Sequence, residues 1–222
     1  MRKMEKLLIA IDGPAGAGKT TVSQALAGRL GYRYIDTGAL YRGVAYEVIK
    51  QAVDPEDDSD LERLCGRLKL WFVEDNGSLR LFSEGTDISD QIRTPKITML
   101  ASAVSARPVI RKYLLDLQRK LGREKAAVFE GRDMGTVVFP DADLKFFLDA
   151  SRRKRALRRF EEFKSKTSQT LKEVENEIQQ RDRNDSTRDV APLKPAQDAI
   201  IIDSTDLTVN EVVDFMVSHI MK

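Results

Sequence analysis

The segment 13–20 (GPAGAGKT) holds the residues with the most recognisable chemistry in the chain. It matches the pattern G-x-x-x-x-G-K-[ST], with an apolar run before it and a helical pattern after it. Glycines let the backbone curl so that successive N–H groups point inward, and the N-terminus of the following helix adds partial positive charge. Lys19 supplies a cation for the β- and γ-phosphates, and the Thr20 hydroxyl can ligate Mg²⁺. We therefore expect this loop to bind a nucleoside triphosphate. The residues assigned to it are Gly13, Pro14, Ala15, Gly16, Ala17, Gly18, Lys19, Thr20 and Thr21.

Apolar runs elsewhere in the chain predict the strands that position this loop. The run before the loop, at 7–11, has counterparts at 32–35, 126–129, 144–148 and 199–202. Helical patterns separate the runs, and the last helix is expected at 210–221. The sequence therefore predicts an α/β fold with a doubly wound, five-stranded parallel sheet, whose ligands bind at the carboxyl ends of the strands.

The pattern changes between residues 62 and 95, where an antiparallel hairpin is predicted. Two β-rich runs, 68–73 and 78–82, flank a turn that contains Asn76-Gly77, and a third extended piece is expected at 86–88. We interpret 62–95 as an insertion into the parallel fold, either with a role in the site or as a decoration of its edge.

The charge-rich segment 151–189 predicts a mobile helical lid, with its second helix at 170–182. Such a lid would exclude water, which competes with the acceptor for a transferred phosphoryl group. A basic arm for RNA or DNA is the alternative, but Phe160 and Phe163 are the only aromatic residues available for stacking there. The core then comprises 1–61, 96–150 and 190–222.

Composition narrows the class of protein. The chain has 222 residues, of which 41% are hydrophobic and 32% charged, as in globular proteins rather than disordered ones. A net charge of +2 is too small to indicate a nucleic-acid binder, and the single Cys65, expected to be half-buried, excludes an internal disulfide and a cysteine metal cluster. There is no membrane-length apolar run and no secretory leader pattern, so a cytoplasmic location is expected.

Arginines at predicted ligand-side positions favour a phosphotransferase. They are Arg42, Arg111, Arg132, Arg181 and Arg188, and Arg111 lies off the apolar stripe of its helix, where we expect it to be free to reach a ligand. A planar guanidinium suits both the binding of phosphates and the stabilisation of a moving phosphoryl group. A guanine-reading Asn-Lys-x-Asp sequence is absent, and motor ATPases need a longer chain, which weakens those alternatives.

Four segments together resemble the bacterial cytidylate kinases, and the resemblance runs essentially from end to end. They are 13–20, 36–42 (DTGALYR), 131–142 (GRDMGTVVFPDA) and 188–193 (RDVAPL), of which the third is the most specific. Thr37 stands where serine is frequent in that family, and it keeps the hydroxyl. The resemblance implies a nucleoside monophosphate kinase fold with a core, a nucleotide-binding insertion and a lid. It also implies phosphorylation of CMP and dCMP by ATP with Mg²⁺.

The resemblance also implies roles for individual residues. Ser102, Arg111 and Asp133 would read cytosine, Asp185 would hold the sugar, and Arg158 with its lid neighbours would face ATP. Lys19, Arg132, Arg181 and Arg188 would form the catalytic set. The expected CMP-binding residues are Thr37, Arg42, Ser102, Arg111, Arg132, Asp133, Arg181, Asp185 and Arg188.

The chemistry of the base supports this implied selectivity independently. Cytosine presents an N4 amino donor beside N3 and O2 acceptors, so a carboxylate such as Asp133 with a donor such as Arg111 or Ser102 matches it. Uracil presents an acceptor at O4 and would repel the carboxylate, so CMP is expected over UMP.

No general base is required, because the acceptor phosphate is already anionic near neutral pH. Asp36 and Glu130 are both candidates for ordering the water ligands of Mg²⁺. The expected partners are the small molecules ATP and CMP or dCMP, without nucleic acid or membrane, and the chain is expected to be a monomer. Two alternatives remain: a kinase of the same architecture for another nucleoside monophosphate or for shikimate, and a nucleotide-dependent RNA-binding or regulatory module.

Overall fold

The computed structural model describes residues 6–75, 77–163 and 169–220. Asn76 of the predicted hairpin turn and Met221 of the last predicted helix lie outside the described residues. The chain divides into two compact units: the first unit is Met1–Tyr34 with Glu124–Lys222, and the second is Ile35–Arg123. Within the described ranges, no helix is long and apolar enough to cross a lipid bilayer.

The first unit is built on a five-stranded sheet of order β2-β6-β1-β7-β8, which confirms the predicted parallel α/β fold. The bounds of its elements are β1 (Leu8–Asp12), α1 (Lys19–Leu30), β2 (Arg33–Asp36, at the boundary between the units), β6 (Ala127–Gly131), the π-helix η1 (Met134–Val138), β7 (Leu144–Asp149), α6 (Arg152–Phe163), α7 (Leu171–Thr187), β8 (Ile200–Asp203) and α8 (Val209–Ile220). Every residue of β1 is buried, because β1 has a strand on each side and packed side chains on both faces.

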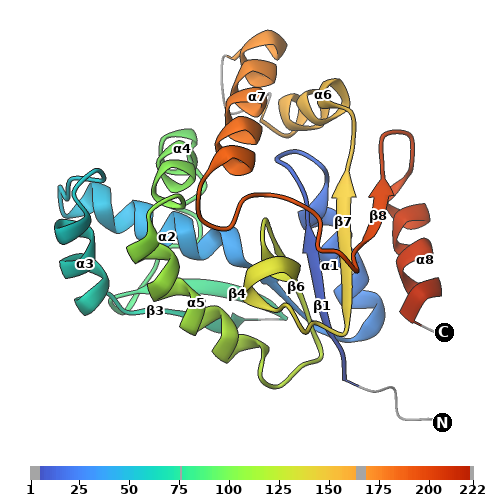
Figure 1. Cartoon of the computed structure of the whole chain (residues 1–222), viewed down its shortest axis with the longest axis horizontal. Helices are drawn as coiled ribbons and strands as arrows, with labels where there is room; N and C mark the ends of the chain where they lie inside the picture. The colour runs from blue at the N-terminus through green and yellow to red at the C-terminus, as the bar shows by residue number, and fades with distance from the viewer. Residues whose placement is uncertain (1–5, 76, 164–168, 221–222) are drawn as a thin grey trace. The chain divides into compact units, whose positions relative to one another are not determined.

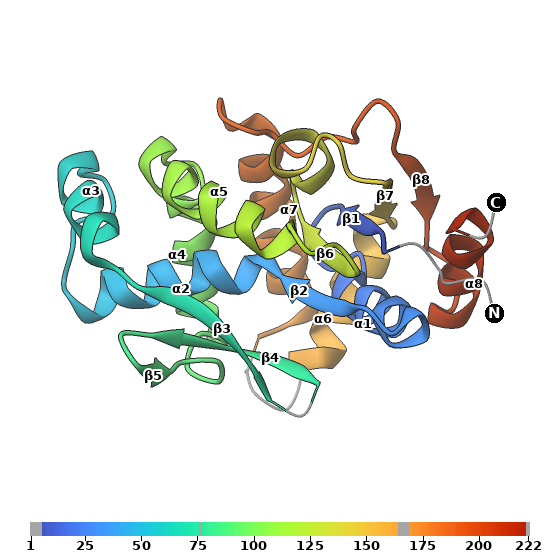
Figure 2. The ribbon, with the colours of Figure 1, turned by 90° about the horizontal axis from the view of Figure 1, so that it is seen from below.

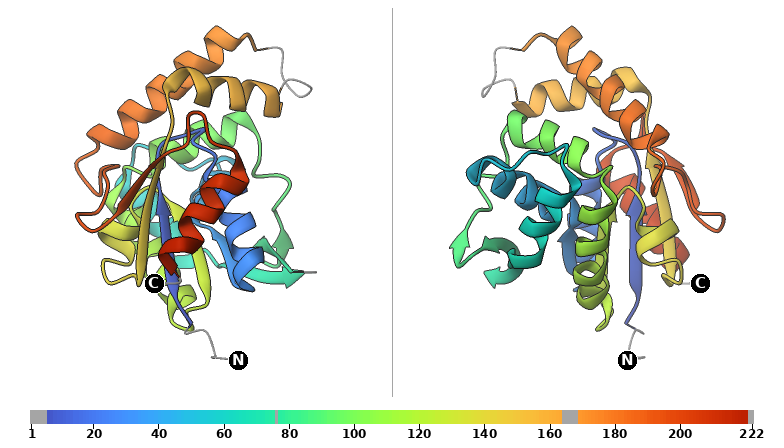
Figure 3. Two further views of the ribbon diagram at one scale, coloured as in Figure 1. Left: turned by 90° about the vertical axis from the view of Figure 1, so that its right-hand side faces the viewer. Right: turned by 60° about the vertical axis from the view of Figure 1, so that its left-hand side comes forward.

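Helices cover the sheet and its carboxyl end. α1 and α8 pack together and share a core with the sheet that includes Ile11, Leu26, Phe146 and Met216. α6 and α7 lie side by side beyond the carboxyl ends of β1 and β7 (Figure 1, Figure 3). Helix α7 begins one residue later than the predicted 170–182 and ends five residues later, at Thr187.

The second unit holds an antiparallel sheet of order β3-β4-β5 together with helices α2 to α5 (Figure 2). The bounds of its elements are α2 (Thr37–Lys50), α3 (Asp58–Arg67), β3 (Leu70–Asp75), β4 (Ser78–Ser83), β5 (Thr86–Asp87), α4 (Pro95–Val104) and α5 (Pro108–Gly122). A separate core fills it, with Leu40, Leu61, Leu81 and Leu114 fully buried.

Local signals explain where these elements begin. Asp36 caps α2 by accepting a hydrogen bond from the Ala39 N–H, and prolines occupy the first turns of α4 and α5. Cys65, expected to be half-buried, is buried in α3. The hairpin lies inside the predicted insertion 62–95, and α3 begins before that segment. The division into core, insertion and lid stays a prediction.

Candidate active site

The loop between β1 and α1 has the geometry of a phosphate cradle. Gly13, Gly16 and Gly18 have φ of 150°, 75° and 91°, a region of backbone conformation that favours glycine. A Cβ added to Gly13 would lie 2.0 Å from the carbonyl oxygen of Leu148 on β7, so only glycine fits there. Gly18 takes the N-cap position of α1 in the left-handed conformation, and the loop therefore leads directly into a helix N-terminus.

Lys19 is buried at the start of α1. Its Nζ donates a hydrogen bond of 2.7 Å to the carbonyl oxygen of Pro14, within the loop. Burial lowers the pKa of Lys19 to about 7, and the positive charges of Arg132 and Arg181 contribute to the same shift. A cation that is disfavoured by burial and by like charges gains from any anion placed beside it, as the oxygens of a polyphosphate would be.

Thr20 and Glu130 form an oxygen-rich pair next to the loop. The Thr20 hydroxyl donates to Glu130 Oε1 at 2.9 Å, and the Tyr34 hydroxyl donates to the same oxygen. Oxygen donors of this kind suit Mg²⁺, which usually takes one or two protein ligands together with substrate phosphates and water. In the described part of the chain no cluster of three or more His, Cys, Asp or Glu side chains that could hold a metal ion occurs.

Arginine–carboxylate pairs surround the end of β6. Arg132 Nε donates to Asp185 of α7 at 2.7 Å. Burial by itself would raise the pKa of Asp185, but the guanidinium groups of Arg132, Arg181 and Arg188 hold it below its ordinary value. The structure thus brings together four of the residues predicted to bind the acceptor, all within the first unit.

Asp133, the predicted base-reading carboxylate, is buried beside Arg188. Arg188 Nη2 lies 3.5 Å from Asp133 Oδ1, and Arg188 Nε donates to the carbonyl oxygen of Ala191 at 2.7 Å. Asp133 makes no side-chain bond to the helix η1 that it precedes. Its carboxylate is therefore not used as a helix cap.

Two arginines of α6 bond directly to the phosphate loop. Arg158, predicted to face ATP, donates to the carbonyl oxygen of Ala17 at 3.2 Å and to Ser204. Arg155, a lid neighbour of Arg158 for which no individual role was predicted, is buried and donates to the carbonyl oxygen of Ala15 at 3.0 Å and to Asp182 of α7 at 2.7 Å. The sequence could have indicated this role, because Arg155 and Arg158 are three residues apart and therefore lie on the same face of the helix.

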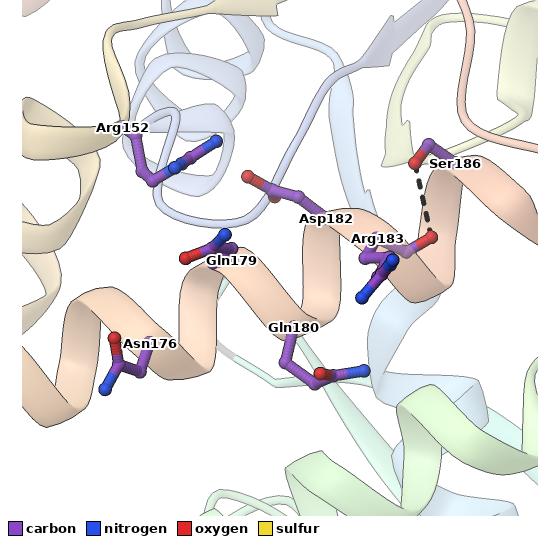
Figure 4. Close-up of a pocket in the computed structure, with 7 residues that line it drawn as sticks. All are labelled: Arg152, Asn176, Gln179, Gln180, Asp182, Arg183 and Ser186. Atoms are coloured by element: carbon purple, nitrogen blue, oxygen red, sulfur yellow. Dashed lines mark hydrogen bonds between the residues drawn. The ribbon is translucent and has the colours of Figure 1, made fainter.

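A polar pocket of about 650 Å³ lies between the start of α6 and one face of α7 (Figure 4). Arg152, Gln179 and Asp182 point into the same space, and the Ser186 hydroxyl donates to the carbonyl oxygen of Arg183. None of the lining residues belongs to the predicted ATP or CMP set.

The remaining predicted residues belong to the second unit. Thr37 is the first residue of α2 and is buried, and Arg42 Nη2 donates to Asp36 Oδ2 at 2.6 Å. Burial alone would raise the pKa of Asp36, but the guanidinium of Arg42 holds it below its ordinary value. Asp36 is thus the ion-pair partner of Arg42, whereas Glu130 bonds to Thr20.

Arg111 differs from expectation, because it is not free. It is buried in α5, its Nη1 donates to the carbonyl oxygen of Ser105 at 3.1 Å, and its guanidinium carbon lies 5.7 Å from the ring centroid of Tyr41. Ser102 lies on α4, and its hydroxyl oxygen is buried with no hydrogen-bond partner among the described residues. A buried hydroxyl without a partner is costly, which is consistent with a residue that bonds to a ligand.

Known proteins resemble this chain over nearly its whole length. The profile of the family described as Cytidylate kinase matches residues 9–222. A cytidylate kinase of Geobacter sulfurreducens is 50% identical over 213 residues, which cover 96% of this chain and 91% of that protein. A cytidylate kinase of Halalkalibacterium halodurans is 42% identical over 218 residues, 98% of each chain.

Solved structures agree on the fold. A shikimate kinase from Acinetobacter baumannii in complex with shikimate aligns over 98% of this chain and 94% of its own, with a TM-score of 0.51 and 15% identity. At that identity the likeness concerns architecture alone. The family profile and the identity to relatives decide the membership: this chain belongs to the cytidylate kinase family.

Proposed function

We propose that this protein transfers the γ-phosphoryl group of ATP to CMP or dCMP, giving ADP and CDP or dCDP. An oxygen of the acceptor phosphate bonds to the γ-phosphorus, and the bond from that phosphorus to the β,γ-bridging oxygen breaks, so that this oxygen leaves with ADP. The acceptor oxygen is anionic near neutral pH, and no general base is needed. The observation that carries the proposal is the buried Lys19 of the phosphate loop, whose charge is disfavoured until anionic oxygens are beside it.

ATP is assigned to the loop 13–20 with Thr21 and Arg158. Lys19 would contact the β- and γ-phosphates and stay with the γ-group as it moves. Thr20 would ligate Mg²⁺, with Glu130 ordering the water ligands of the ion, because these two side chains already share a hydrogen bond. When bound, Mg²⁺ neutralises charge on the phosphate oxygens.

CMP is assigned to the residues that the sequence predicts for it. Asp133 would accept a hydrogen bond from the N4 amino group of cytosine, with Ser102 and Arg111 as the donors for its acceptor edge, and Asp185 would bind the sugar. The buried Ser102 hydroxyl without a partner and the buried Asp133 support this assignment. The phosphate of CMP is assigned to Arg42, Arg132, Arg181 and Arg188, of which the last three would also stabilise the transferred group.

The division into a core, an insertion at 62–95 and a lid at 151–189 that closes over ATP belongs to the same proposal. Both substrates are cytoplasmic nucleotides, and we place the protein in that compartment as a monomer.

The test is ADP release with CMP, dCMP, UMP, AMP, GMP and shikimate as acceptors. We expect turnover with CMP and dCMP well above the others, and loss of turnover in Lys19→Met. Lys172→Met, which removes an exposed lysine of α7, is the matched control and should behave as the wild type. Preference for another acceptor would make the protein a different kinase of this fold. Tight RNA binding without CMP-dependent ADP release would favour a regulatory module.

A further inference from the structure

Asp12 joins the strand before the phosphate loop to the segment that carries Asp133. It is the last residue of β1 and is buried. Its Oδ1 accepts the backbone N–H of Met134 and its Oδ2 accepts that of Gly135, each at 2.8 Å. The contact follows from the sheet, because β1 pairs with β6 so that Asp12 lies opposite Gly131, three residues before Met134.

These two bonds serve as the cap of η1. The first N–H groups of any helix lack a partner within the helix and are usually satisfied by the side chain in the N-cap position. Here that position is Asp133, which makes no side-chain cap bond and accepts the Val137 and Val138 N–H groups through its carbonyl oxygen. Asp12 supplies the cap from another strand, so the Asp133 carboxylate is not needed for it.

The capped segment is held tightly. A Cβ added to Gly135 would lie 3.1 Å from the Lys145 side chain and 3.5 Å from Ala196, so η1 has little space on that side. At the far end of the segment, Lys145 Nζ donates to the carbonyl oxygen of Pro140. Asp12 therefore holds the end next to Asp133 by hydrogen bonds, whereas the ammonium group of Lys145 bonds at the end remote from it.

The carboxylate of Asp12 that forms the cap is also in an environment that shifts its pKa. Burial raises the pKa of Asp12 to about 6, the bonds from Gly135 and Met134 oppose the rise, and the charges of Asp133 and Lys19 act in opposite directions on it. A buried carboxylate between these groups is held in place mainly by its two N–H donors.

We propose that Asp12 is a positioning residue for selection of the acceptor base: by capping η1 it fixes the backbone at Asp133, so that the Asp133 carboxylate meets the amino group of cytosine. This inference rests on the proposed function. In this role Asp12 acts through the backbone of Met134 and Gly135.

The test is Asp12→Asn, in which the amide oxygen still accepts one N–H while the amide NH₂ faces the other. We expect the KM for CMP to rise roughly 10- to 100-fold, which corresponds to the loss of one charge-assisted buried hydrogen bond. The ratio of kcat/KM for CMP to kcat/KM for UMP should fall in parallel. The KM for ATP should stay within about threefold, a split that a general loss of structure would not give. Lys145→Met, which releases the remote end of the same segment, is the matched control and should keep the CMP/UMP ratio.

A double variant separates action through Asp133 from action on the fold. In an Asp133→Ala background, Asp12→Asn should leave the CMP/UMP ratio unchanged, because the group it positions is gone. If Asp12→Asn does not fold, as judged by circular dichroism, Asp12→Ser, which keeps one acceptor without a buried charge, carries the same test.

The outcomes are distinct. A wild-type protein that does not phosphorylate CMP contradicts the proposed function. A wild-type protein that does, with an Asp12→Asn variant that keeps both the KM for CMP and the CMP/UMP ratio, overturns the role of Asp12. Equal rises in the KM for ATP and CMP with an unchanged ratio overturn it as well.

Discussion

Asp133 and Arg188 form a buried contact that is longer than a strong ion pair. Their closest approach of 3.5 Å is long for a charge-assisted hydrogen bond, which is usually 2.7–2.9 Å. A ligand amino group at Asp133 would add a bond to the carboxylate without having to break a short hydrogen bond to Arg188. Selectivity for the base therefore depends on these individual side chains.

Replacing Asp133 by Ala should reduce kcat/KM for CMP by at least about tenfold more than for UMP, because only cytosine offers a donor to the carboxylate. Steady-state kinetics with both acceptors measure the difference. Asp198→Ala, which removes an exposed partner of Lys145, is the control and should leave the ratio unchanged. Equal losses with CMP and UMP would remove Asp133 from base reading.

The pKa of Asp12 predicts a pH dependence of stability. The pKa is about 6 in the folded chain and 3.8 for the ordinary group, so the native state binds the proton more tightly. The contribution of Asp12 is therefore fully present below pH 3.8 and is lost as the pH rises through about 6. The free energy of unfolding of the wild type minus that of Asp12→Asn should fall by about 1 kcal/mol between pH 5 and pH 8. Urea unfolding measures this, and a difference that is flat or rises with pH would contradict it.

At the scale of elements, β7 and α6 shape the phosphate loop as much as the loop's own sequence does. The carbonyl oxygen of Leu148 leaves no room for a side chain at Gly13, and Arg155 and Arg158 bond to loop carbonyl oxygens. The curled conformation is therefore supported by an adjacent strand and by the first helix of the predicted lid.

Gly13→Ala should destabilise the protein by more than about 3 kcal/mol and abolish ATP binding, because the new Cβ overlaps the Leu148 carbonyl oxygen and the φ of 150° is strained. Gly28→Ala in α1 is the matched control: nothing lies within 4 Å of its Cβ, and the change should be neutral or stabilising by about 1 kcal/mol. Thermal unfolding and ATP titration measure both. A Gly13→Ala variant with wild-type stability would show that the loop is not confined in this way.

At the scale of the whole molecule, each of the two units has a main hydrophobic core of its own among the described residues. The boundary between Tyr34 and Ile35 falls inside β2, so one strand carries residues of both units. Unfolding of either unit would disrupt a strand of the main sheet, and we expect the units to unfold together.

Trp71, the single tryptophan of the chain, reports on the second unit from β3, where it stacks on Phe82. Its fluorescence transition in urea should coincide with the far-ultraviolet circular dichroism transition, which averages over both units. ATP at 100 times its Kd should shift both midpoints together, by a stabilisation of about 2.7 kcal/mol. Separate midpoints, or a shift in the dichroism alone, would mean that the units unfold independently.

The sequence by itself determined the phosphate loop, the five parallel strands and the hairpin, because these depend on local patterns: apolar runs of strand length, glycine spacing and turn residues. It also selected Arg132 and Arg188 from their positions along the chain, whereas Asp185 was predicted only from the resemblance to the cytidylate kinases. It did not reveal that Arg111 is buried, because an off-stripe position on a helix can still be covered by another element.

Only the tertiary structure decided the contacts between distant residues. The cap of η1 by Asp12, the bond from Arg155 to the loop and the lowered pKa of Lys19 all depend on which strands and helices become neighbours. Asp12 and Met134 are 122 residues apart and meet because β6 pairs with β1 in one register. Strand order and burial are set by the packing of the whole first unit, and no local pattern encodes them.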